Sequence, residues 1–123
     1  GAVNLPLREA VKAFKPSDLA LEFHLNAAAA PTATGVETLS APKDYAFCKK
    51  LTSLLASTLG ITDRGAKPEN SGQHSRLAFV QAGGIIVELF FLTNKTDLGK
   101  YFAKKEVLAK EVAKLIVEHA DAQ

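Results

Sequence analysis

The sequence is poor in residues on which several common classes of protein depend. Its 123 residues include one cysteine, no methionine and no tryptophan. A single cysteine excludes an internal disulfide and any zinc site built from four cysteines. Because methionine is absent throughout and the chain starts at Gly1, we expect that it has been trimmed or processed.

Long apolar runs and a strong net charge are also missing. No stretch approaches the roughly 20 apolar residues that span a bilayer, and residues 1–4 lack the basic region and apolar core of a signal peptide. The formal net charge of +2 is too small to indicate a nucleic-acid partner. The length suits one domain, residues 1–123, with a sizeable core. We therefore expect a single domain that binds neither nucleic acid nor membrane.

The most apolar stretch, residues 85–92, is predicted to be the central strand. It reads Ile-Ile-Val-Glu-Leu-Phe-Phe-Leu and follows a pair of glycines. A short run rich in β-branched and aromatic residues is typical of a strand buried on both faces. Glu88 lies in its middle, and burying an unpaired carboxylate costs several kcal/mol. Glu88 is therefore expected to lie beside a cation, a metal ion or a wet cleft, with a structural ion pair to Arg64 or Arg76 as the alternative.

A second predicted strand, residues 19–25, also carries ionisable side chains in an apolar segment. It is apolar except for Glu22 and His24, and Asn26 follows it. Side chains two residues apart on a strand share a face, so these three polar groups project together. If the two strands are neighbours, this polar face meets Glu88. From the residues alone, the favoured interpretation of His24 is a core histidine hydrogen-bonded to Glu22 or Glu88.

The rest of the chain alternates between helical and extended patterns. We predict a helix over 4–14, a strand over 35–40, a helix over 43–59, a polar loop over 61–76, a short strand over 77–82, a short helix from 94 to 102 and a last helix over 104–119. Cys48 falls on the apolar side of the second helix and is expected to be a small core residue. The alternation predicts an α/β domain with helices on both faces of a sheet.

Four segments, in this order along the chain, resemble one known family. They are Phe23-His24-Leu25-Asn26-Ala27, Gly35-Val36-Glu37-Thr38, Arg64-Gly65-Ala66-Lys67, and Val87-Glu88-Leu89-Phe90-Phe91-Leu92-Thr93-Asn94 followed by Asp97. Together they are similar to the zinc-dependent N-acetylmuramoyl-L-alanine amidases, which include bacterial cell-separation amidases and phage endolysins. The stretch Leu21-Glu22-Phe23-His24-Leu25-Asn26 is more similar to the phage endolysin branch than to the secreted bacterial branch.

The resemblance implies a fold and a reaction. The fold would be a twisted, mostly parallel sheet of the amidase, phosphorylase/hydrolase-like type. The reaction would be hydrolysis of the peptidoglycan amide between N-acetylmuramic acid and L-alanine of the stem peptide. By the same resemblance, His24 is a zinc ligand and Glu88 is the catalytic acid–base. Asn26, Arg64 and Lys67 are interpreted as substrate-binding residues, with strand closure for the first and solvated loop charges for the others as alternatives.

The resemblance is incomplete at the N-terminal side. The family takes a further histidine and a glutamate as zinc ligands from segments upstream of the His24 strand, but only 23 residues precede His24 and none is a histidine. The chain is therefore interpreted as the C-terminal two-thirds of the family domain, and we do not expect it to hold zinc tightly by itself. Many relatives have glycine at the position of Phe90. The phenylalanine either alters the cleft beside Glu88 or simply packs against its neighbours.

Two functional hypotheses follow. The first is a phage endolysin made in the host cytoplasm without a signal peptide and acting on peptidoglycan at the cell wall or periplasm. The alternative is a non-catalytic remnant of the fold that binds the cell wall or has a structural role. A sheet edge exposed by the missing strand would favour dimerisation.

Overall fold

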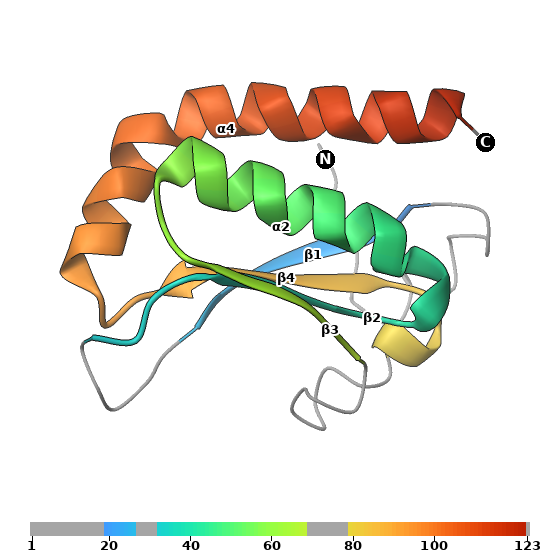
Figure 1. Ribbon diagram of the computed structural model, residues 1–123, viewed down its shortest axis with the longest axis horizontal. Helices are drawn as coiled ribbons and strands as arrows, with labels where there is room; N and C mark the ends of the chain where they lie inside the picture. The colour runs from blue at the N-terminus through green and yellow to red at the C-terminus, as the bar shows by residue number, and fades with distance from the viewer. Residues whose placement is uncertain (1–18, 27–31, 69–78, 123) are drawn as a thin grey trace, which may run out of the picture.

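The computed structural model describes residues 19–26, 32–68 and 79–122. These residues form a sheet and two long helices (Figure 1). In chain order the elements are β1 (Leu21–Asn26), β2 (Val36–Ser40), η1 (Pro42–Asp44), α2 (Tyr45–Leu59), β3 (Asp63–Pro68), β4 (Ile85–Phe91) and α4 (Lys95–Asp121). The helix predicted over 4–14 lies outside the described residues, as do Arg76 and part of the connection between β1 and β2.

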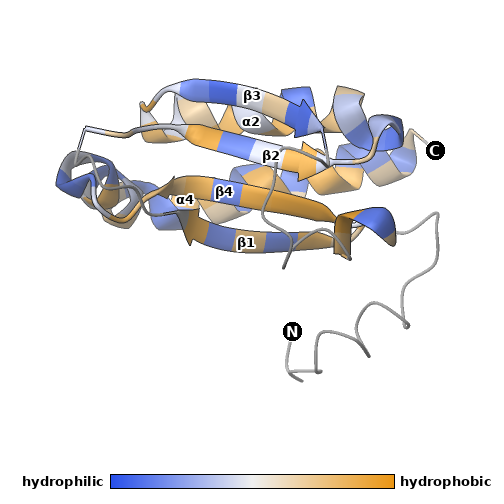
Figure 2. Ribbon diagram, turned by 90° about the horizontal axis from the view of Figure 1, so that it is seen from below, coloured by the Kyte–Doolittle hydropathy of each residue, from blue (hydrophilic) through white to orange (hydrophobic). Residues whose placement is uncertain are grey.

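The sheet has four strands in the order β1-β4-β2-β3, as Figure 2 shows with the helices behind them. β1 pairs with β4 and β2 pairs with β3 in parallel, whereas β2 and β4 are antiparallel. The predicted mostly parallel sheet of an α/β fold is therefore confirmed. β4 is buried along its whole length, as expected for the central strand.

The two long helices, α2 and α4, pack on one face of this sheet (Figure 1). Alternate residues of β4, Ile85 and Val87, join the core beneath the helices, while Ile86 turns to the opposite face. There Ile86 packs with Leu39 of β2 and with residues 79–80. The larger core therefore lies on the helix side, and the opposite face carries a smaller apolar cluster beside its polar groups.

The helix α2 follows its sequence pattern closely. Phe47, Leu51, Leu55 and Leu59 recur every four residues and are all buried, as required for one stripe of an amphipathic helix. The helix ends at Gly60, whose left-handed backbone (φ 71°) turns the chain so that the N–H of Ile61, like that of Gly60, donates to the carbonyl of Ala56. Its predicted boundaries are thus confirmed to within two residues, with the 3-10 turn η1 preceding it.

Three local predictions are wrong. Residues 61–76 are not one loop, because β3 occupies Asp63–Pro68. Pairing with β2 satisfies the backbone of β3 although its side chains are polar, a combination tolerated at a sheet edge. Residues 79–81 are helical rather than extended. Finally, α4 is one helix of 27 residues instead of two, since no proline interrupts it and Gly99 is tolerated.

None of the helices among the described residues is long and apolar enough to cross a membrane.

Candidate active site

A row of ionisable side chains crosses the face of the sheet opposite the helices. In the register of the sheet, His24 of β1 is opposite Glu88 of β4, and Glu88 is opposite Glu37 of β2. Residues opposite one another on paired strands project from the same face, and neighbouring strands lie about 4.8 Å apart. The sheet therefore places an imidazole on one side of the Glu88 carboxylate and a second carboxylate on the other.

Glu88 is the most enclosed member of this row. Its residue is 3% exposed, in the middle of a strand whose seven residues are all buried. The apolar sequence around it forms this strand, and the alternation of side chains directs Glu88 away from the helix-side core. The prediction that the central strand carries a buried carboxylate is confirmed.

His24 has a carboxylate partner within its own strand. Its ring nitrogen Nε2 contacts Oε1 of Glu22, and both side chains are 29% exposed. The contact follows from the strand period, which places residues 22 and 24 on one face. A carboxylate in this position orients the imidazole and leaves Nδ1 as the nitrogen available to another group.

Glu37 lies between Glu88 and an arginine. Its Oε1 is 3.7 Å from Nε of Arg64 on β3, and the guanidinium carbon of Arg64 lies 5.3 Å from the ring centre of Phe91. The structure therefore pairs Glu37 with an arginine of the neighbouring strand. The contact between Phe91 and Arg64 is not predictable from the local sequence pattern, because the two residues are far apart in the chain and lie on different strands.

A register shift between β1 and β4 lies between Glu88 and Phe91. His24 is opposite Glu88, but Asn26 is opposite Phe91, so β4 has one extra residue between them. This irregularity lets Phe90 join the helix-side core, where its ring centre is 5.1 Å from that of Tyr101. Phe90 therefore packs, which was one of the two outcomes considered for it.

A clamp of hydrogen bonds joins the start of α4 to the residues just before β2. The carboxylate of Asp97, 4% exposed, accepts from the hydroxyl of Thr34 and from the N–H of Gly35 at 3.3 Å. Asn94 accepts from the N–H of Asp97 at 3.0 Å and donates its side-chain N–H to the carbonyl of Ala33 at 3.2 Å. Asn94 lies three residues beyond the end of β4, so this clamp holds the segment that leads to Glu37 near that end of the strand.

The other residues predicted for the site, Lys67 and Asn26, are located only by the register of their strands. Lys67 is opposite Leu39 in the register and shares the face of Glu37. Asn26 ends β1 and is opposite Phe91, but the structure does not describe its side chain. Cys48 is fully buried on the sheet-facing side of α2, and burial raises the pKa of its thiol, an effect that the nearby hydroxyls of Ser40 and Thr38 oppose.

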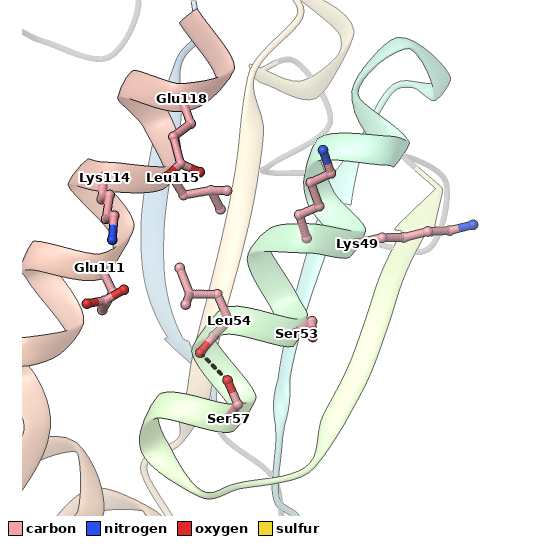
Figure 3. A pocket seen from close by; sticks show the side chains of 9 residues that line it. Lys49, Ser53, Leu54, Ser57, Glu111, Lys114, Leu115 and Glu118 are labelled. Carbon is pink, nitrogen blue, oxygen red and sulfur yellow. Dashed lines mark hydrogen bonds between the residues drawn. The ribbon is translucent and has the colours of Figure 1, made fainter. Parts of the chain in front are cut away.

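A hollow on the helix side of the sheet lies away from the row. It measures about 580 Å³ and is formed between α2 and α4 (Figure 3). Lys49 and Lys50 line it from α2, Glu111, Lys114 and Glu118 line it from α4, and Ser57 donates to the carbonyl of Leu54 at 3.1 Å. Because the helices separate this hollow from the row across the sheet, it contributes nothing to the candidate site.

The described residues do not complete a metal site by themselves. His24 offers an imidazole nitrogen, a ligand that zinc prefers. However, in the described ranges no group of three or more histidine, cysteine, aspartate or glutamate side chains is placed to hold a metal ion. Further ligands would have to come from residues beyond those ranges.

Sequence comparison identifies the family. A family model described as N-acetylmuramoyl-L-alanine amidase matches residues 2–120, nearly the whole chain. The chain belongs to this amidase family. No curated protein is significantly similar to it in sequence.

Solved structures agree with this assignment. A crystal structure described as an N-acetylmuramoyl-L-alanine amidase from Neisseria meningitidis is 47% identical, with a TM-score of 0.87, and the match covers 96% of this chain and 66% of that one. The catalytic domain of the CD27L endolysin, which targets Clostridia difficile, is 30% identical, with a TM-score of 0.60 and coverages of 82% and 52%. An amidase from Clostridium difficile 630 is 22% identical with a TM-score of 0.71, a likeness that shows the fold. The chain thus spans less than two thirds of these amidases.

Proposed function

We propose that the protein takes part in hydrolysing the amide between N-acetylmuramic acid and L-alanine of the peptidoglycan stem. The observation that carries this proposal is the position of Glu88, a buried carboxylate flanked by His24 and Glu37 in a member of the amidase family. Stability alone is a poor reason for a carboxylate in the middle of an apolar strand.

In the proposed reaction Glu88 moves protons. Its carboxylate takes a proton from the attacking water, whose oxygen bonds to the lactyl carbonyl carbon. Glu88 then passes that proton to the leaving nitrogen as the carbon–nitrogen bond breaks, which yields a carboxylic acid and the amine of L-alanine. Its low exposure excludes bulk water from competing for the proton.

We also propose zinc as the cofactor, with His24 as one ligand. Support comes from the orientation of its imidazole by Glu22, an arrangement common around metal-bound histidines. Zinc binding by the purified protein and by its His24→Ala variant tests this point. Because this chain alone is not expected to hold zinc tightly, both proteins are titrated with added zinc: weak binding by the parent and a clear loss in the variant are expected, whereas equal binding by both would exclude His24 as a ligand.

The catalytic proposal is tested on purified peptidoglycan sacculi, by following release of peptides with a new L-alanine amino terminus. Glu88→Gln should lower the rate by roughly 10²–10⁴-fold, because the amide keeps the shape and loses the proton transfer. Glu106→Gln, on the exposed side of α4, is the matched control and should retain the parental rate. A parent protein that binds sacculi without any turnover would instead support the non-catalytic, cell-wall-binding alternative.

A phage endolysin is a second, narrower proposal. It is supported by the 30% identity to the endolysin domain, while the 47% identity to the Neisseria amidase favours a cellular enzyme that remodels its own wall. In either case the proposed partner is peptidoglycan and the site of action is the cell wall. Lysis of intact bacteria from outside, compared with separation defects after deletion of the gene, distinguishes the two roles.

A further inference from the structure

Arg64 has an unusual position in the sheet. Val36 is opposite Asp63 and Glu37 is opposite Gly65, so Arg64 is an extra residue of β3 with no partner on β2. Oδ1 of Asp63 accepts from the N–H of Gly65 at 2.8 Å, and Gly65 has a φ of 86° that few other residues adopt. Irregularities of this kind re-aim a side chain and are frequent beside active sites.

The path of the arginine side chain is kept open by a glycine. A Cβ atom on Gly35 would lie 2.7 Å from Cγ and 2.8 Å from Cδ of Arg64, closer than carbon atoms pack. The aliphatic part of Arg64 therefore lies across the residue that precedes β2, where any side chain would block it. β4 lies two strands away from the edge strand β3 (Figure 2). By crossing Gly35, the side chain of Arg64 on β3 reaches Phe91 on β4.

Two groups then orient the guanidinium. Glu37 meets Nε, the donor nearest the chain, and the ring of Phe91 lies 5.3 Å from the guanidinium carbon. An arginine presents five N–H donors in a rigid plane, and the two terminal nitrogens form the fork that binds a carboxylate. The side chain is 41% exposed, so a ligand can reach it.

We propose that Arg64 is a pre-oriented receptor for a carboxylate of the stem peptide, and that Gly35, Glu37 and Phe91 are its positioning residues. This inference rests on the proposed amidase function. It adds a specificity: the site prefers a stem whose second residue carries a carboxylate over one in which that group is a carboxamide.

The length of the stem peptide is compatible with this assignment. β4 and β3 are separated by β2, so their axes lie about 10 Å apart, and Arg64 leans back from β3 over that gap. An extended peptide advances at most about 3.6 Å per residue. With the scissile amide beside Glu88, the guanidinium is therefore within reach of the second stem residue, one beyond L-alanine.

Two soluble muramyl tripeptides provide the test. Both contain L-alanine, a γ-linked second residue and a terminal lysine, and they differ in whether the α-carboxyl group of the second residue is a carboxylate or a carboxamide. Dissociation constants are measured by NMR titration of the Glu88→Gln protein, which prevents hydrolysis. We expect the carboxylate form to bind about tenfold more tightly, equivalent to about 1.4 kcal/mol.

Variants in the same background assign the preference to Arg64. Arg64→Lys keeps the charge but loses the planar fork, and should reduce the preference to about threefold or less. Arg64→Gln should abolish it, and Phe91→Leu should lower it while the arginine remains. Lys49→Gln, an exposed lysine of α2 on the opposite side of the sheet, removes the same charge and should leave the preference unchanged.

The outcomes separate the two proposals. Equal binding of both tripeptides, or a preference that survives Arg64→Gln, overturns the role of Arg64 and leaves the amidase proposal standing. Failure of both tripeptides to bind overturns both proposals. A purely structural Arg64 would change the free energy of unfolding and leave the ratio of dissociation constants as it was, so the ratio distinguishes these cases.

Discussion

Replacing Asp97 by alanine is expected to destabilise the fold strongly, through the clamp between α4 and β2. The carboxylate accepts two hydrogen bonds, from the Thr34 hydroxyl and the Gly35 N–H, in a position where Asp97 is 4% exposed. Hydrogen bonds to a charged group are worth about 1.5–3 kcal/mol each. Removing the buried carboxylate also recovers its desolvation cost. The net loss expected for Asp97→Ala is therefore about 3 kcal/mol, a large part of a total stability of about 5–15 kcal/mol.

The assay is urea unfolding followed by far-UV circular dichroism, with equal slopes of the free energy against urea in parent and variants. Asp97→Asn retains one acceptor oxygen and should lose about 1–2 kcal/mol. Glu106→Ala removes the same charge from an exposed position of the same helix and should change stability by less than about 0.5 kcal/mol. If Asp97→Ala matched this control, the clamp would contribute no net stability and the reasoning would be refuted.

Two further predictions concern packing and the buried thiol. A Cβ atom on Gly84 would lie 2.3 Å from the Phe79 ring, so Gly84→Ala should lower the free energy of unfolding in urea by about 1–3 kcal/mol. Gly99→Ala, in open space on α4, should raise it by about 0.5–1 kcal/mol. Similar changes for both variants would contradict the close approach of the Phe79 ring to Gly84. Because burial raises the pKa of Cys48, its alkylation at mildly alkaline pH should be roughly 100-fold slower in the native than in the urea-unfolded protein. The folded state favours the neutral thiol, so the stability that Cys48 contributes is complete below the ordinary thiol pKa and declines as the pH rises above it. Equal alkylation rates in the native and the unfolded protein would show that the thiol is accessible and would contradict its burial.

The clearest sequence signals came from segments whose pattern repeats over several turns or residues. The run around Glu88 is apolar enough to be recognised as a central strand, and the four-residue spacing from Phe47 to Leu59 defines α2. The strand period also placed Glu22 and His24 on one face, where the structure finds them in contact.

Other features had no local signal. β3 is polar and reads as a loop, because what makes it a strand is the hydrogen bonding of β2 rather than its own apolar pattern. For the same reason Arg64 was assigned to a loop, and its approach to Glu37 and Phe91 went unrecognised. The single helix α4 was divided in two, because the apolar stripe weakens near Phe102, which is 60% exposed.

By itself, the sequence determined the class of fold, the central strand with its carboxylate, and the residue types suited to the chemistry. The tertiary structure alone decided that His24, Glu88 and Glu37 form one row and that Arg64 crosses Gly35 to reach Phe91. Local pattern reports which face of a strand is buried. The order and register of strands depend instead on contacts between segments far apart in the chain, and those contacts bring the candidate site together.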